Sequence, residues 1–224
     1  MKIDILTLFP EMFTGFINSS IIKRAIENNK VTINTIDYRK FSKLNNNQVD
    51  DTAFGGGTGM VIMCEPVVDA IESIKTKDSH VILLDPKGEV YSQEKAVSLS
   101  SYKHLILICG HYEGIDERIK NFVDEVISIG DYVLTGGEVA SMIIADSITR
   151  LIPGVITGSS LTSESFSDNL LDYPVYTKPR NFRGYEVPEV LLSGDHKKIN
   201  EYRQSERLRI TKEVRPDLLE KKHE

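Results

Sequence analysis

The chain has 224 residues, of which 40% are apolar and 27% are charged. This length and this apolar content suffice for one large domain with a hydrophobic core, or for a large domain and a small one, and they argue against a coiled coil, a collagen and a disordered chain. The formal net charge of −6, taken over the whole chain, argues against a nucleic-acid-binding protein.

The charge is unevenly distributed along the chain. From Val175 to the end there are 12 basic and 9 acidic residues, which leaves 15 basic and 24 acidic residues before Val175. The C-terminal segment therefore carries +3 and the preceding part carries −9.

The sequence shows no targeting leader and no apolar run of the roughly 20 residues that a membrane helix needs. Two cysteines are present, Cys64 and Cys109, and Cys109 ends the apolar run HLILIC. We therefore expect a cytoplasmic protein with reduced thiols and no membrane association, in which Cys109 is a small buried residue.

Short apolar runs alternate with segments of helical periodicity. The runs predict strands at Ile3–Phe9, Val31–Tyr38, His80–Leu84, His104–Cys109 and Glu125–Ile129. The periodic segments predict helices over Met12–Asn28, Pro66–Lys75, Gln93–Leu99 and Asp116–Phe122, and from Gly137 to Ile152. The last helix is preceded by Thr135, which has the spacing of a capping box with Glu138. Nearly continuous apolar strands separated by helices indicate an α/β fold with a parallel sheet covered on both faces.

The composition changes in the C-terminal third. Residues from Thr157 to about Arg183 are rich in Ser, Thr, Asn, Pro and Gly and predict a linker. The segment LLDYPVY (170–176) is too apolar for a passive tether, so we expect something to pack on it, for example a second chain or a substrate. From Asp195 the sequence is rich in helix formers with basic residues, and EVLL (189–192) is its one strand candidate. A small, basic, mostly helical unit is expected.

Glycine-bearing loops carry the strongest functional signal. The segment DTAFGGGTGM (51–60) matches neither a phosphate loop nor GxGxxG, so a surface loop and a ligand-cradling loop both remain open. LDPKG (84–88), CGHYEG (109–114) and IGDYVLTGG (129–137) each follow a predicted strand directly. Because ligands bind outside the carboxyl ends of parallel strands, these three loops predict one pocket built mainly from backbone.

The candidate polar residues have structural alternatives. Asp116 and Glu117 fit the cap and first turn of a helix better than a metal site, whereas Glu113 lies outside that helix and is freer to be functional. The five histidines show no metal-ligand spacing. Arg150 lies near a helix C-terminus, where a cation is favoured by the helix dipole, so a structural and a functional role both stay open.

Seven ordered motifs resemble a known family. DILTLFPEMF, FGGGTGM, GHYEGIDER, IGDYVLTGGE, SITRLIPGV, SFSDNLLDYPVYTKP and VPEVLLSGDH together resemble the bacterial tRNA (guanine-N1)-methyltransferases of the TrmD type, within the trefoil-knotted SPOUT methyltransferases. The resemblance runs from residue 3 to about residue 217. It implies an α/β parallel sheet with a C-terminal trefoil knot, which spacing alone does not suggest because threaded chains are rare.

The resemblance also implies an organisation and an activity. Residues 1–157 would form the knotted catalytic domain, residues 158–183 an interdomain linker and residues 184–224 a helical tRNA-binding domain. The implied reaction is the S-adenosylmethionine-dependent methylation of N1 of guanosine 37 in tRNA. The implied assembly is a homodimer with active sites shared between subunits. Mg²⁺ is a possible further requirement, for which the sequence shows no site.

Site residues follow from the same resemblance. Glu164 would be the general base, Arg150 the cation that stabilises the guanine O6, and Glu113 a residue near the cofactor and the target base. The implied cofactor contacts are Leu84, Pro86, Gly110, Ile129, Gly130, Asp131, Tyr132, Val133, Leu134, Gly136 and Gly137. The implied tRNA contacts are Asp172, Tyr173, Lys178, Arg180, Arg183, His196 and Arg203, with Lys197, Lys198, Arg207 and Arg209 as further phosphate contacts.

Two positions depart from the family pattern. Glu164 stands where the family has Asp, so Asp168 is kept as an alternative base, and His111 stands where the family often has Arg. Two rival functions also remain open at this point. One is a knotted methyltransferase with another RNA target, and the other is an RNA-binding protein that lost catalysis through the change at Glu164.

Overall fold

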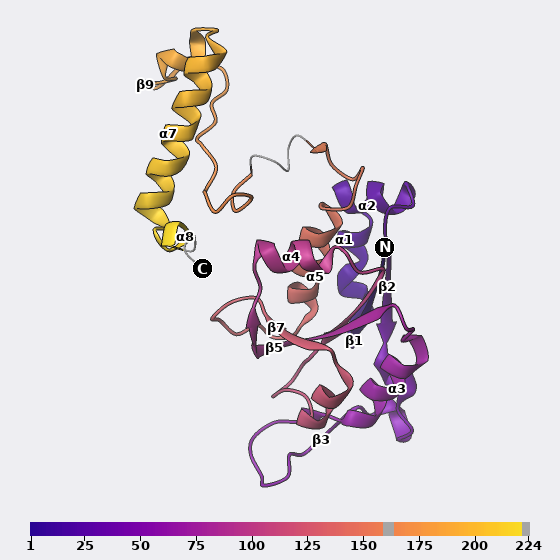
Figure 1. Ribbon diagram of the computed structural model, residues 1–224. Helices are drawn as coiled ribbons and strands as arrows, with labels where there is room; N and C mark the ends of the chain where they lie inside the picture. The colour runs from indigo at the N-terminus through magenta and orange to yellow at the C-terminus, as the bar shows by residue number, and fades with distance from the viewer. Residues whose placement is uncertain (159–163, 221–224) are drawn as a thin grey trace. The chain divides into compact units, whose positions relative to one another are not determined.

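The structure is a computed structural model that describes residues 1–158 and 164–220. The chain divides into two compact units, Met1–Ile156 and Thr157–Glu224 (Figure 1). Each unit is described by itself.

A five-stranded parallel sheet forms the centre of the first unit. Its strands are β1 (Lys2–Thr7), β2 (Thr32–Asp37), β5 (Ser79–Val90), β6 (His104–Cys109) and β7 (Glu125–Ser128), in the order β2-β1-β6-β5-β7. The parallel sheet is confirmed, and four strands lie within two residues of their predicted bounds. Strand β5 is longer than predicted, because its pairing with β7 resumes at Glu89 after an irregularity that follows Leu84.

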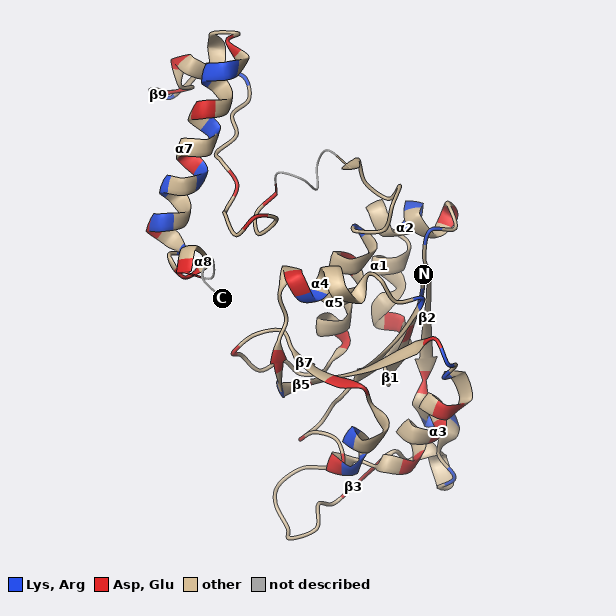
Figure 2. Cartoon of the chain, in the orientation of Figure 1, with Lys and Arg blue, Asp and Glu red and all other residues tan. Residues whose placement is uncertain are grey.

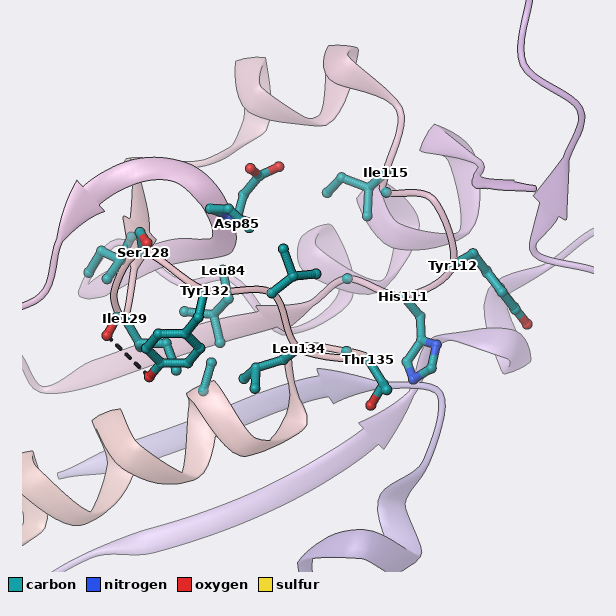
Figure 3. Close-up of a pocket in the computed structure, with 18 of the residues that line it drawn as sticks. Leu84, Asp85, His111, Tyr112, Ile115, Ser128, Ile129, Tyr132, Leu134 and Thr135 are labelled. Atoms are coloured by element: carbon teal, nitrogen blue, oxygen red, sulfur yellow. Dashed lines mark hydrogen bonds between the residues drawn. The ribbon is translucent and has the colours of Figure 1, made fainter. Parts of the chain in front are cut away.

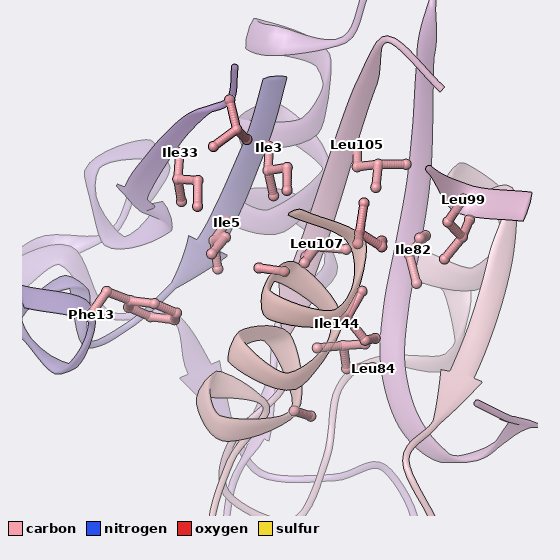
Figure 4. Close-up of a cluster of buried hydrophobic side chains, with 14 of the residues drawn as sticks. Ile3, Ile5, Phe13, Ile33, Ile82, Leu84, Leu99, Leu105, Leu107 and Ile144 are labelled. Carbon is pink, nitrogen blue, oxygen red and sulfur yellow. The ribbon is translucent and has the colours of Figure 1, made fainter. Parts of the chain in front are cut away.

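Both faces of the sheet are buried, as continuous apolar strands require. Ile82 and Leu84 of β5 face one apolar cluster, whereas Val81 and Leu83 face the other. The first cluster packs under α2 (Ser20–Glu27), α4 (Gln93–Leu99) and α5 (Glu138–Thr149), as Figure 4 shows for α5. The second packs under α3 (Cys64–Ile74) and the 3-10 helices η2 (Tyr38–Phe41) and η4 (Glu117–Phe122).

The helix expected over Met12–Asn28 is wrong as a single element. The chain forms η1 (Pro10–Phe13), α1 (Thr14–Ile17) and then α2, with Ser20 at a positive φ of 53° where α2 begins. The predicted helix Asp116–Phe122 is also a 3-10 helix rather than an α-helix. The short η3 (Asn45–Asn47) and the antiparallel pair β3 (Asp50–Asp51) and β4 (Val61–Ile62) complete the first unit.

The capping box predicted at Thr135 and Glu138 is wrong. The residue before α5 is Gly137, which makes no side-chain capping bond. The Glu138 side chain is buried and accepts a hydrogen bond from Thr7 Oγ1 at 2.8 Å. The Glu138 carboxylate, which the local sequence pattern assigned to a helix cap, therefore forms a long-range hydrogen bond with Thr7 instead.

The second unit contains a short hairpin and one long helix. The hairpin pairs β8 (Asn181–Phe182) with β9 (Tyr185–Glu186), which the sequence did not predict. The segment EVLL, expected as a strand, is the 3-10 helix η5 (Glu189–Leu192). It is followed by α7 (His196–Val214) and α8 (Asp217–Glu220). Among residues 1–158 and 164–220, no helix combines the length and the apolar character that crossing a membrane requires.

Candidate active site

A pocket of about 190 Å³ lies at the carboxyl ends of β6 and β7 and at the irregularity that follows Leu84 within β5 (Figure 3). The three glycine-bearing loops that the sequence placed at this edge converge on it. Every residue predicted to contact a cofactor lines the pocket, except Asp131. Glu113 lines it as well, together with residues that were not predicted as cofactor contacts, namely Asp85, His111, Tyr112, Gly114, Ile115, Ile127, Ser128, Thr135 and Ala140.

The loops after β6 and β7 are packed backbone against backbone. Gly137 N donates to Gly110 O at 2.9 Å, and His111 pairs with Gly136 as an isolated antiparallel bridge. A Cβ at Gly137 would lie 2.7 Å from the Cα of Cys109. Only glycine allows this approach, so Gly137 fixes the distance between the two loops that form one wall of the pocket.

The opposite wall is formed by residues 127–134. Gly130 has a φ of 142°, and the Tyr132 ring packs where a Cβ of Gly130 would lie. The Tyr132 hydroxyl donates to Ile129 O at 3.4 Å (Figure 3). Apolar side chains supply the rest of this lining: Leu84, Ile127, Ile129, Leu134 and Ala140. A flat apolar group with polar edges suits such a pocket, because its edges can meet backbone amides.

A buried carboxylate lies behind the loop that carries Gly136. Glu138 is 2% exposed, and its Oε2 lies 3.8 Å from Nε2 of His111 on the pocket lining. Tyr38 is buried on the same side and donates to Cys109 O at 3.3 Å. Burial raises the pKa of Tyr38, and the nearby Cys109 and Glu138 raise it further. One signal for this cluster is present in the sequence, the acid in TGGE, but its local spacing assigned that acid to a helix cap.

The glycine-rich segment 51–60 has two different halves. A Cβ at Gly55, Gly56 or Gly57 would meet nothing within 4 Å, so this half is an open surface loop. The other half packs on the pocket, because a Cβ at Gly59 would lie 2.4 Å from Cγ of Glu113. Glu113 N also donates to Met60 O at 3.1 Å. The surface-loop interpretation thus holds for Gly55–Gly57, and the second half supports Glu113, whereas a ligand-cradling role for this segment stays a prediction.

The acidic residues after Glu113 have a structural role. Asp116 accepts from Arg118 N at 2.9 Å and pairs with the Arg118 guanidinium, which lowers the pKa of Asp116. Its predicted capping role is confirmed. Within the described ranges, no three His, Cys, Asp or Glu side chains are grouped so as to hold a metal ion. Cys109 is buried as expected, and burial raises the pKa of its thiol.

The two implied catalytic residues outside the pocket lie in different units. Arg150 follows the last residue of α5, and its backbone N–H donates to Asp146 O at 3.1 Å. Glu164 belongs to the second unit, where its carbonyl accepts from Ser167 N at 3.2 Å.

The alternative base, Asp168, is engaged by an arginine. Its carboxylate forms a two-pronged pair with Arg207, which is 3% exposed, and this pair lowers the pKa of Asp168. Arg207 was expected as a phosphate contact, and its burial contradicts that expectation. The linker was expected to pack on a second chain or a substrate, but residues 168–173 pack on α7 of their own unit.

The remaining predicted tRNA contacts divide by exposure. Lys178, Arg180, Arg183, His196 and Lys197 are exposed. Arg203 is half-buried, with its guanidinium 4.8 Å from the centroid of the Tyr173 ring. Arg209 pairs with Glu206 and Glu213 along α7 (Figure 2).

The fold and the pocket together define an α/β protein with a largely backbone-walled pocket at the carboxyl edge of a parallel sheet, which is where ligands bind in such folds. Comparison with known proteins narrows this class. Residues 1–221 match the family model described as tRNA (Guanine-1)-methyltransferase TrmD, and the chain belongs to this family.

Individual relatives are similar along almost the whole chain. A tRNA (guanine-N(1)-)-methyltransferase of Malacoplasma penetrans is 59% identical over 97% of this chain and 96% of its own length. Proteins with the same name from Carboxydothermus hydrogenoformans and Staphylococcus aureus are 57% and 54% identical, over 98% and 99% of this chain and 87% and 91% of their own lengths.

Proposed function

We propose that this protein transfers a methyl group from S-adenosylmethionine to N1 of guanosine 37 in tRNA, next to the anticodon. The observation that carries the proposal is the backbone-walled pocket of a TrmD-family chain, which gathers the residues implied to hold the cofactor. As its substrate would be tRNA, we expect the protein to act in the cytoplasm. The family's trefoil knot, formed by the loops around this pocket, is part of the proposal.

The pocket residues fit S-adenosylmethionine by their chemistry. The apolar side chains between Ile127 and Leu134 suit an adenine ring, and the glycine backbones at 110, 130, 136 and 137 allow polar edges to approach amides. Carboxylates of Asp85 and Glu113 line the same pocket, where negative charge favours a cationic ligand. The described residues offer no comparable fit for Mg²⁺, and we assign no step to a metal ion.

When bound, S-adenosylmethionine supplies an activated methyl group that leaves a neutral thioether. The protein must then align N1 of the guanine and remove its proton. Glu164 accepts this proton as the new N1–C bond forms, and Arg150 stabilises the negative charge that develops on O6. Glu113, held against Gly59 at the pocket lining, orients the target base.

We further propose a homodimer in which the Glu164 of one subunit serves the pocket of the other. Helix α5, which begins at the pocket wall, exposes Val139 and Ile143, and η1 exposes Met12. Exposed apolar side chains on elements next to a site are typical of a surface that another chain covers. Phosphate contacts from the exposed basic residues of the second unit would then set the register of the tRNA.

Nucleoside analysis tests the reaction. After incubation of the full-length protein with S-adenosylmethionine and tRNA carrying guanosine or adenosine at position 37, mass spectrometry should detect 1-methylguanosine only with the guanosine-37 tRNA. Methylation elsewhere would indicate another RNA target. Cofactor binding without any methyl transfer would indicate the binding-only alternative.

Variants test the proposed residues. Arg150→Ala and Glu164→Gln should each lower the rate of methyl transfer by about 100-fold or more, because each removes a group that acts in the transition state. The dissociation constant for S-adenosylmethionine, measured by calorimetry, should stay within about threefold. Glu164→Asp restores the residue typical of the family and should retain most activity. Equal loss of rate and cofactor affinity would contradict the assigned roles.

A further inference from the structure

We propose that Arg207 is a positioning residue, through which helix α7 holds residues 164–172 in one conformation and thereby sets where the Glu164 carboxylate stands. This inference rests on the proposed function, because it takes Glu164 as the general base. It concerns only contacts within the second unit.

Each of the three guanidinium nitrogens of Arg207 donates a hydrogen bond to the linker. Nη1 lies 2.9 Å from Oδ2 of Asp168, Nη2 pairs with Oδ1 of the same carboxylate, and Nε donates to Leu171 O at 3.2 Å. A planar guanidinium that binds both oxygens of a carboxylate fixes orientation as well as distance. Arg207 therefore holds Asp168 and Leu171 at once.

Two further residues, one in α7 and one directly after it, contact the linker. Thr211 Oγ1 accepts from Leu171 N at 2.8 Å and donates to Arg207 O at 2.7 Å. The guanidinium of Arg215, which follows α7, lies 5.9 Å from the centroid of the Phe166 ring. Residues 207 and 211 are four apart within α7, which places them one turn apart on the same face of the helix. The linker is thus held at more than a single contact.

The linker carries this anchoring back to Glu164. Phe166 N donates to Leu170 O at 2.8 Å, and Asp172 N donates to Ser165 Oγ at 2.9 Å, so residues 165–172 form a closed loop. Ser167, next to Asp168, donates to Glu164 O from its backbone and from its hydroxyl, at 3.2 and 2.7 Å. The backbone of Glu164 is therefore hydrogen-bonded to Ser167, and the next residue, Asp168, forms the ion pair with Arg207.

The arrangement has a consequence for rate rather than for affinity. A general base must stand within hydrogen-bond reach of the proton it removes, and a displacement of about 1 Å can lower a rate by about 100-fold. Because Arg207 is buried against the linker, it is not placed to contact a phosphate itself. Loss of Arg207 should thus slow proton removal while tRNA still binds.

The test compares two variants of the full-length protein. Arg207→Gln removes the ion pair with Asp168. Lys212→Gln, the control, removes one positive charge from an exposed position of the same helix. Single-turnover methyl transfer is measured at saturating tRNA and cofactor from pH 6 to 9, with tRNA affinity measured separately. We expect Arg207→Gln to lower the rate about 10- to 100-fold with tRNA affinity within about threefold, and Lys212→Gln to change the rate less than twofold. The rate of Arg207→Gln should also keep rising with pH where the wild-type rate levels off.

A double variant makes the test specific to Glu164. If Arg207 acts through Glu164, Arg207→Gln should have no further effect on the rate in a Glu164→Gln background. A further fall in the double variant, or a loss of tRNA affinity that matches the loss of rate, would overturn the proposal. Thr211→Val removes the hydroxyl that accepts from Leu171 N, on the same helix. It should lower the rate less than Arg207→Gln does and should show the same dependence of the rate on pH. This variant replaces Arg207→Gln in the test if Arg207→Gln does not fold.

The failure of this proposal is distinguishable from a failure of the proposed function. A wild-type protein that forms no 1-methylguanosine would overturn the function and the inference together. A wild-type protein that is active and depends on Glu164, but whose Arg207→Gln variant is equally active, would overturn the inference alone.

Discussion

Gly137 is the residue at which the pocket tolerates least change. A Cβ there would lie 2.7 Å from the Cα of Cys109 and 3.1 Å from Gly110 N, and backbone atoms cannot move aside as a flexible side chain can. Gly137→Ala should therefore separate the loops after β6 and β7, and calorimetry should show affinity for S-adenosylmethionine reduced about tenfold or more.

Gly15→Ala is the matched control for this prediction. Gly15 lies in α1, and a Cβ there would meet nothing within 4 Å. Alanine is favoured over glycine in a helix by up to about 1 kcal/mol, so this variant should bind the cofactor normally and unfold at an equal or higher temperature. Normal cofactor binding by Gly137→Ala would show that the pocket is assigned to the wrong ligand.

Cys109 gives the protein a predictable weakness at alkaline pH. The thiol is 1% exposed, and burial raises its pKa above the value of about 8.5 that it has in the unfolded chain. Above pH 8.5 the unfolded state loses this proton while the native state keeps it, so the free energy of unfolding falls as pH rises.

The size of this effect follows from the unfolded pKa. Between pH 7.5 and 9.5 the contribution amounts to roughly 1.4 kcal/mol. The free energy of unfolding should be measured by urea unfolding at both pH values for the wild type and for Cys109→Ala. The variant should be less stable than the wild type at pH 7.5. Its fall in stability between pH 7.5 and 9.5 should be smaller than that of the wild type by about this amount. An identical loss in both proteins would mean that the thiol titrates normally in the fold.

Glu138 shows why single residues of the site escaped sequence analysis. Its spacing from Thr135 is that of a capping box, yet its hydrogen-bond partner, Thr7, is 131 residues away. The glycine loops were predictable, because each follows an apolar run that ends at a sheet edge. The carboxylate behind them was not, since the partner of a buried polar group depends on which strands become neighbours.

At the scale of elements, strands were predicted better than helices. The runs of β1 and β6 are buried on both faces and nearly continuous in sequence, whereas β2 has polar residues between Ile33 and Ile36 and β7 is fully buried only at its end. The segment Met12–Asn28 has helical periodicity throughout, but Ser20 adopts a positive φ and divides it. Periodicity reports which residues face the core and is insensitive to such a break.

The linker is the element whose role changed most. Its apolar content correctly indicated that something packs on it, but the partner is α7. Arg207 and Asp168 are 39 residues apart, and a charge pattern along a helix does not reveal which arginine is buried. The sequence therefore could not separate the basic residues that hold the linker from those that remain available to a ligand.

At the scale of the whole molecule, the net charge of −6 lies in the first unit, because the second unit has 12 basic and 12 acidic residues. The second unit carries basic residues of two kinds. Arg207 and Arg209 are engaged by carboxylates of the same unit, whereas Lys178, Arg180, Arg183 and Lys197 are exposed and form no ion pair among the described residues. Lys212 is exposed and without an ion pair there as well, but only the first four were predicted as tRNA contacts, so we count about four cations as available to phosphates.

This number sets the salt dependence of RNA binding. Each neutralised phosphate contributes about −0.7 to −0.9 to the slope of log affinity against log salt, so four contacts give a slope of about −3 and a loss of about 60-fold between 50 and 200 mM salt. Affinity for S-adenosylmethionine, held mainly by backbone in the first unit, should change less than about twofold. Filter binding and calorimetry over this range check both, and Lys178→Gln with Arg180→Gln should reduce the slope by about 1.5. A slope near zero would mean that the exposed cations of the second unit do not meet the RNA backbone.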